Sequence, residues 1–61
     1  GSFIFEDTPL KEVLTCLSEY YKVSFIADDL SKKLSGEFHT DDLDLIITLI
    51  ESALDVNIIK R

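Results

Sequence analysis

The chain repeats itself with an offset of 33 residues, and this repeat restricts the fold more than any other feature. Shifting the sequence by that offset lays ten apolar positions on ten others: Phe5 on Phe38, Leu10 on Leu43, Val13 on Ile46, Leu14 on Ile47, Leu17 on Ile50, Tyr20 on Ala53, Tyr21 on Leu54, Val23 on Val56, Phe25 on Ile58 and Ile26 on Ile59. The matches continue from the segments with helical spacing of apolar residues into the segments where apolar and polar residues alternate. Because a unit of this size cannot bury its apolar face alone, we expect the two copies to pack together.

The first half of the chain has the pattern of a strand, a helix and a second strand. Phe3 to Phe5 is a short β-prone run, and apolar residues then follow at helical spacing. Between them lies a helix-start signal, in which Asp7 or Thr8 is the expected N-cap and Pro9 suits the first helical position. Alternation returns from Lys22 to Ala27 and predicts the next strand.

The second half repeats this pattern. It predicts a strand from Leu34 to His39, with a bulge or a close approach of another backbone at Gly36. Thr40 is the expected N-cap of a helix whose apolar residues run from Leu43 to Leu54, and Val56 to Ile59 is the fourth strand. We therefore predict an α+β fold in the order β-α-β-β-α-β. Its two βαβ repeats place two adjacent helices against small β-sheets.

Three residues lie beside or away from the apolar stripes of the helices. Cys16 and Leu49 flank the stripes at equivalent positions, so we predict that both lie in helix–helix contact. Leu45 differs, because its counterpart is Glu12, on the side of the helix away from the sheet. We expect Leu45 either to be covered by a longer protein or to belong to a contact surface.

Alternation within the strands turns most of their apolar residues to one face and leaves Ile4, Ile26 and Ile59 on the other. Three isoleucines on one sheet face, if contiguous, form a patch that indicates a partner. We predict that charged substitutions there weaken partner binding and leave the fold intact.

Open strand edges are a second means of recognition, because exposed edges pair with other chains unless they are blocked. The C-terminal strand, Val56 to Lys60, is a candidate edge. The predicted partner-binding residues are Ile4, Ile26, Ile59, Leu45, Val56 and Ile58.

Size and charge exclude several classes of function. A chain of 61 residues forms one domain at most, and its net charge of −6 argues against binding nucleic acid or anionic lipid. Cys16 is the single cysteine, so no intrachain disulfide forms. No run approaches the roughly 20 apolar residues of a membrane span. Gly1-Ser2 is typical of a cleaved expression tag, so we expect one domain over residues 3–61, taken from a longer protein.

Few residues suit catalysis or metal binding. His39 is the single histidine and has no orienting acid or second ligand in the sequence pattern. Asp28 and Asp29 fit a solvated turn. The aspartates at the start of the second helix complement its dipole and lack the ligand spacing of a calcium loop. These are Asp41, Asp42 and Asp44. We predict a binding module with no catalytic residue, metal or cofactor; a small enzyme or metal site on Asp28, Asp29 and His39 is the alternative from another class.

The order of these elements resembles a known family. Phe3-Ile-Phe-Glu-Asp-Thr-Pro-Leu-Lys-Glu-Val-Leu, followed by Leu17, Tyr20-Tyr21 and Val23, is similar to the opening of the C-terminal domain of FecR-type anti-sigma regulators, particularly those of Bacteroidetes. Gly36-Glu-Phe38, Asp42-Leu43 and the second helix resemble its second half. The wider group is the secretin and TonB short N-terminal domain, whose helices lie side by side between small sheets. That arrangement implies that the side chain of Leu45 packs beneath another part of the fold.

The resemblance implies a role in signalling. FecR-like proteins cross the inner membrane once, hold an extracytoplasmic-function sigma factor through a cytoplasmic part, and present this domain to the periplasm. There it senses the signalling domain of a TonB-dependent outer-membrane receptor. The alternative within the same fold is the N-terminal signalling domain of such a receptor, or of a secretin. The resemblance transfers no catalytic or binding residue.

Overall fold

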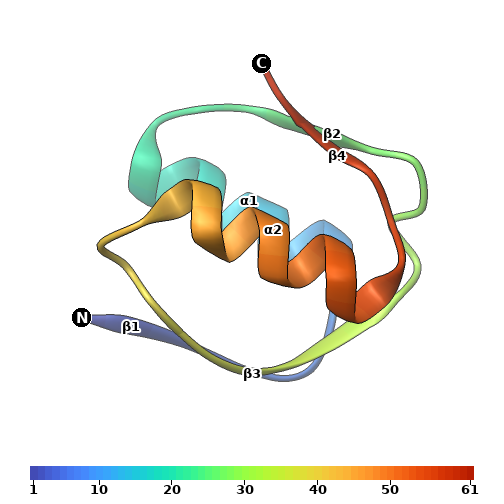
Figure 1. Ribbon diagram of the computed structural model, residues 1–61, viewed down its shortest axis with the longest axis horizontal. Helices are drawn as coiled ribbons and strands as arrows, with labels where there is room; N and C mark the ends of the chain where they lie inside the picture. Colours follow the sequence, from blue (N-terminus) through green and yellow to red (C-terminus); the bar gives the residue numbers. More distant parts are fainter.

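The computed structural model describes residues 1–61 and confirms the predicted order of elements (Figure 1). The strands and helices are β1 (Ser2–Pro9), α1 (Leu10–Tyr21), β2 (Phe25–Ala27), β3 (Lys33–His39), α2 (Leu43–Leu54) and β4 (Ile58–Lys60). Both ends of α2 lie 33 residues after those of α1, and the same holds for β4 and β2. β2 and β4 begin later than predicted, because Lys22 and Asp55 end the helices in left-handed conformations, with φ of 61° and 54°.

Each strand pairs with a strand from the other half of the chain. β1 pairs antiparallel with β3 and β2 with β4, which gives two separate two-stranded sheets. The helices lie between the sheets, one in front of the other in the view down the shortest axis (Figure 1). A two-stranded sheet is at best marginally stable alone in water. Neither half of the repeat can form a sheet by itself, so the two halves depend on each other.

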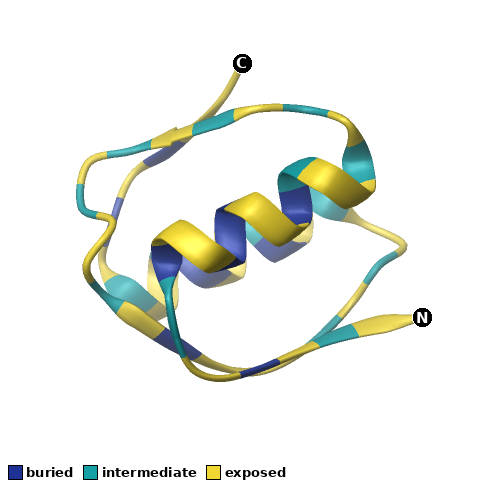
Figure 2. Ribbon diagram, turned by 180° about the vertical axis from the view of Figure 1, so that it is seen from behind, coloured by how far each residue is buried: buried dark blue, intermediate teal, exposed yellow.

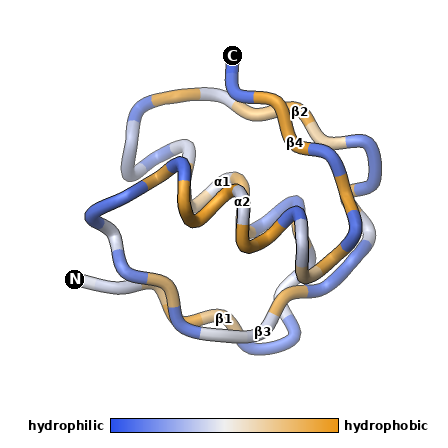
Figure 3. Tube along the Cα trace, viewed as in Figure 1, coloured by the Kyte–Doolittle hydropathy of each residue, from blue (hydrophilic) through white to orange (hydrophobic).

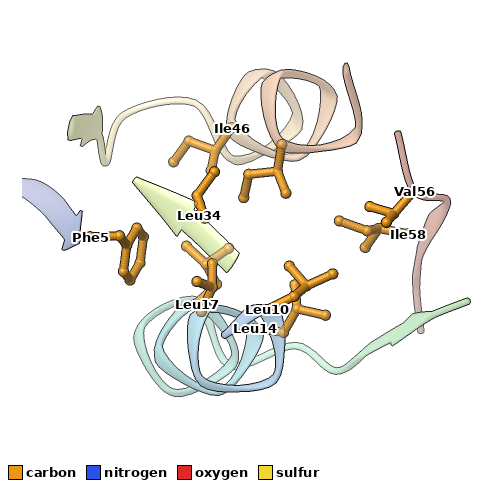
Figure 4. Packing of buried hydrophobic residues seen from close by; sticks show 10 residues of the cluster. Phe5, Leu10, Leu14, Leu17, Leu34, Ile46, Val56 and Ile58 are labelled. Atoms are coloured by element: carbon orange, nitrogen blue, oxygen red, sulfur yellow. The ribbon is translucent and has the colours of Figure 1, made fainter. Parts of the chain in front are cut away.

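Buried apolar side chains fill the space between the helices and sheets, and none of the buried residues is polar. They are Phe5, Leu10, Val13, Leu14, Leu17, Leu34, Ile46, Ile50, Val56 and Ile58. Figure 4 shows α1 and α2 on opposite sides of this cluster, with strands closing the other two sides. Exposed residues follow the outer side of the helix that faces the viewer in Figure 2. The outer sides of the helices therefore form much of the surface.

β1 contains a β-bulge, which begins opposite Gly36, the residue at which the sequence predicts a bulge or a close approach of another backbone. Phe5 pairs with Gly36 and Thr8 with Leu34, so β1 has one extra residue between these pairs. Asp7 within this bulge has a φ of 51°, and its N–H donates to Oγ of Ser35 at 2.8 Å. The bulge thus belongs to β1, while Gly36 itself has a φ of 143° that a side chain would strain.

The start of α1 differs from the prediction. β1 continues to Pro9, which stands at the N-cap position without a side-chain cap, so Asp7 and Thr8 are not caps. Oγ1 of Thr8 instead accepts the N–H of Glu6 at 3.2 Å. The N–H of Leu10 donates to the carbonyl of Lys32 at 2.7 Å. The first N–H of α1 is therefore bonded to a carbonyl from a distant part of the chain and not to the side chain of a preceding capping residue.

The start of α2 also differs by two residues. Asp42 is the N-cap, and its Oδ1 accepts the N–H of Leu45 at 3.1 Å. The hydroxyl of Thr40, the predicted cap, donates to the carbonyl of Gly1 at 3.1 Å. Asp41 and Asp42 thus lie just before the helix, and Asp44 lies in its first turn.

The prediction that Cys16 and Leu49 meet between the helices is wrong. Cys16 is exposed, and Leu49 is 47% exposed. The helices face each other through buried residues such as Leu17 and Ile46 (Figure 4). The flanks of both stripes therefore turn outward beside the sheets.

Candidate protein-interaction surface

The aspartates considered for a metal serve as backbone anchors. Oδ1 of Asp28 accepts the N–H of Asn57, and its Oδ2 accepts the side-chain amide of Asn57, each at 3.0 Å. These two hydrogen bonds, the backbone one first, hold the pKa of Asp28 below its usual value of 3.8. Hydrogen bonds from the hydroxyl and N–H of Ser31 similarly lower the pKa of Asp29. No group of three or more His, Cys, Asp or Glu side chains is placed to hold a metal ion.

The isoleucines predicted on one face belong to two different sheets. Ile26 and Ile59 pair directly across β2–β4 and are 46% and 62% exposed. Ile4 is 75% exposed but lies in β1–β3, opposite Glu37. Their exposure agrees with the alternation. The three isoleucines are not contiguous, however, because the strands divide into two separate sheets. Figure 3 shows the apolar β2–β4 pair at the opposite edge of the molecule from β1.

Two of the predicted partner-binding side chains are part of the core. Val56 is 5% and Ile58 is 8% exposed, so neither side chain is available to a partner. The edge of β4 is also partly occupied, since the carboxylate of Glu51 in α2 accepts the N–H of Ile58 at 2.8 Å. Alternation could not reveal this contact, which joins the helix to the strand that follows it.

A groove runs between the end of β3 and the outer side of α2. Leu45 and Leu49, one helical turn apart, are 53% and 47% exposed and line it together with Phe38 and Ile46. The remaining lining residues are Glu37, His39, Asp41 and Asp42. No lysine or arginine lines this groove. We call it the α2 groove; it has an apolar floor and an acidic rim.

The α2 groove has a counterpart in the first half of the chain, lined by Ile4, Phe5, Thr8, Lys11, Glu12, Thr15 and Cys16. We call this the α1 groove. The offset of the repeat carries Glu12 to Leu45 and Cys16 to Leu49. The sequence therefore identified Leu45 as a surface residue but missed Leu49. The exposure of Leu49 is matched by that of Cys16, which occupies the equivalent position in α1 and is also exposed.

A hydrogen bond connects the end of α1 to the segment beside the α2 groove. The hydroxyl of Tyr21 donates to the carbonyl of Thr40, between β3 and α2. Burial chiefly, and then coulombic repulsion from Tyr20, Asp41 and Asp42, raise the pKa of Tyr21 above its usual value of 10.0.

The sequence model of one protein family, described as FecR, C-terminal, matches residues 2–61. The chain belongs to the FecR C-terminal family. This family is regulatory and non-catalytic. No curated protein and no solved structure matches the chain.

Membership of the FecR C-terminal family agrees with the resemblance inferred from the residues and with the observed helices between two small sheets. It associates the chain with FecR-type anti-sigma regulators. The cover that the wider group implied for Leu45 is absent from this chain, where that side chain is 53% exposed. Neither helix has the length and apolar character required to cross a membrane.

Proposed function

We propose that this FecR C-terminal domain is the periplasmic protein-interaction domain of a FecR-type transmembrane anti-sigma regulator. In this role it receives a signal from the signalling domain of a TonB-dependent outer-membrane receptor and so controls an extracytoplasmic-function sigma factor. The sigma factor is bound by other parts of the full-length protein. The observation that carries this proposal is the family match over residues 2–61.

The exposed aliphatic side chains support a role in protein recognition. Ile4, Ile26, Ile59 and Leu45 are each between 46% and 75% exposed. Contact surfaces between proteins concentrate apolar side chains at their centres. We propose that the partner is contacted through one of the surfaces on which these four residues lie, with Val56 and Ile58 in the core beneath.

Isothermal titration calorimetry of this domain with the purified signalling domain of its cognate receptor tests the proposal. We expect saturable binding, with no binding to the signalling domain of an unrelated TonB-dependent receptor. Absence of binding to the cognate domain, or equal binding to both, would show that the proposed function is wrong.

A further inference from the structure

The α2 groove has an apolar floor that the fold itself does not require. Glu12 and Cys16 occupy the positions in α1 that Leu45 and Leu49 occupy in α2. Both helices have the same length, and Val13 and Leu17 of α1 are buried at the positions of the buried Ile46 and Ile50 of α2. The first half therefore builds the same architecture with a charged and a small side chain at these positions. Since packing does not account for two half-exposed leucines, a contact outside this chain is their simplest explanation.

The charges around the two leucines specify the chemistry of that contact. Glu37 and Asp41 are exposed at the rim, and Asp42 is exposed beside them. Asp44 follows in the first turn of α2, where it is 86% exposed and 3.5 Å from Nζ of Lys60. The α1 groove, in contrast, contains both Lys11 and Glu12. The two grooves therefore differ in the charges that line them, which are of both signs in the α1 groove and acidic in the α2 groove.

We infer that the α2 groove binds a basic amphipathic segment of the partner protein, with aliphatic side chains of that segment on Leu45 and Leu49 and its lysines or arginines facing Glu37 and Asp41. This rests on the proposed function for the identity of the partner, the receptor signalling domain. Amphipathic segments are commonly bound by their apolar face in a groove, and complementary charge increases association rate and selectivity. The two leucines cover a small area, which suits a transient signalling contact.

The Ile26–Ile59 pair on β2–β4 is the competing surface. It is a cross-strand pair on a two-stranded sheet, and neither isoleucine lines a groove of the molecule. Lys60 and Arg61 follow Ile59 and Asp28 lies two residues after Ile26, so this surface is bordered by charges of both signs and not by an acidic rim. The observations therefore favour the α2 groove as the recognition surface.

Binding of substituted domains to the receptor signalling domain tests this inference. Leu45→Glu and Leu49→Glu alter exposed positions, and circular dichroism establishes that each variant is folded. We expect each to weaken binding about tenfold or more, as loss of a central contact residue does. Cys16→Glu, the matched control in the α1 groove, should bind like the wild type. Chemical shift changes in the ¹⁵N-labelled domain should centre on Leu45 and Leu49.

The acidic rim is tested by charge and salt. Glu37→Lys and Asp41→Lys should weaken binding several-fold. Raising NaCl from about 0.1 M to about 1 M shortens the screening length from about 10 Å to about 3 Å, and should weaken binding of the wild type more than binding of these variants. Equal salt dependence of all three proteins would contradict the role of the rim.

The possible failures are distinguishable. If the receptor domain binds but its effects centre on Ile26 and Ile59 or on Ile4, the groove is not its site and the inference is wrong, while the proposed function stands. If the receptor domain does not bind, the proposed function fails, and a synthetic amphipathic helix of Leu and Lys decides the chemistry of the groove. Binding of that peptide at Leu45 and Leu49, lost when Glu replaces every Lys, supports the inference; binding elsewhere or none overturns it.

Discussion

The carboxylate of Glu51 accepts the backbone N–H of Ile58, with 2.8 Å between Oε2 and N. The N–H of Arg61 donates to the carbonyl of Ser24 across β2–β4. Hydrogen-bonded pairs alternate along an antiparallel ladder, so the N–H of Ile58 is directed away from β2. Glu51 therefore occupies the open edge of β4, where a partner strand or a second copy of the domain would otherwise pair.

Glu51→Ala should both destabilise the domain and expose that edge. A part-buried N–H without a partner costs about 1–3 kcal/mol, so the free energy of unfolding in urea should fall by about that amount. Sedimentation velocity should detect more self-association than in the wild type. Glu51→Gln keeps an acceptor oxygen and should retain most of the stability. A Glu51→Ala variant as stable and as monomeric as the wild type would show that the edge is protected otherwise.

Asp28 should make the stability depend on acid pH. Hydrogen bonds from Asn57 lower its pKa in the folded domain below 3.8, so the folded state binds this proton less readily than the unfolded state does. Its contribution is complete above the unfolded pKa and is lost as the pH falls through the folded pKa. The melting temperature of Asp28→Asn should therefore lie below that of the wild type by a constant amount above about pH 5, and the two should converge as the pH falls below about 4. An equal difference at about pH 3 and at about pH 7 would contradict the assignment.

The Tyr21 hydroxyl should link the end of α1 to the start of α2. Tyr21→Phe removes its hydrogen bond to the carbonyl of Thr40 and should lower the free energy of unfolding by about 1 kcal/mol. The pKa of Tyr21 is raised above 10.0, so this contribution is complete below pH 10.0 and decreases as the pH rises through the folded value. Urea unfolding at neutral and alkaline pH measures both effects. Tyr20→Phe serves as the control, and a loss equal to that of Tyr21→Phe would contradict the specific role of Tyr21.

Gly36→Ala should destabilise the β1–β3 sheet. Its φ of 143° is rarely adopted by residues with a side chain, and an added Cβ would approach the Phe38 ring at 3.4 Å. A backbone held in such a region costs about 1–3 kcal/mol, which thermal unfolding would detect. Ser52→Ala, an exposed change within α2, is the comparison and should leave the melting temperature nearly unchanged. Equal stability of Gly36→Ala and the wild type would show that β3 adapts to the side chain.

The sequence predicted the elements better than their connections in space. The helical stripes that begin at Leu10 and Leu43 gave both helices, because side-chain period reports directly which residues face the core. The predicted N-caps, Asp7 or Thr8 for the first helix and Thr40 for the second, were wrong for a physical reason. A capping side chain competes with any nearby carbonyl or N–H, and here Lys32 and Gly1 supply tertiary partners.

For the candidate surface, the sequence identified Leu45 through its mismatch with Glu12 and identified the exposed Ile26 and Ile59 through alternation. It could not assemble them. Alternation gives the face of a strand but carries no information on which strands share a sheet, so Ile4 was grouped with isoleucines that lie in the other sheet.

By itself, the sequence determined that this chain is a doubled β-α-β unit whose halves must cover each other, since its apolar positions match at one offset. Only the tertiary structure decided that each sheet takes one strand from each half, that Glu51 occupies the edge at Ile58, and that Leu45 and Leu49 share a groove with acidic residues. The physical reason is the range of the interactions. Periodicity reflects the environment of each residue along its own element, whereas strand pairing, edge protection and grooves depend on segments far apart in the chain that meet only after the core has formed.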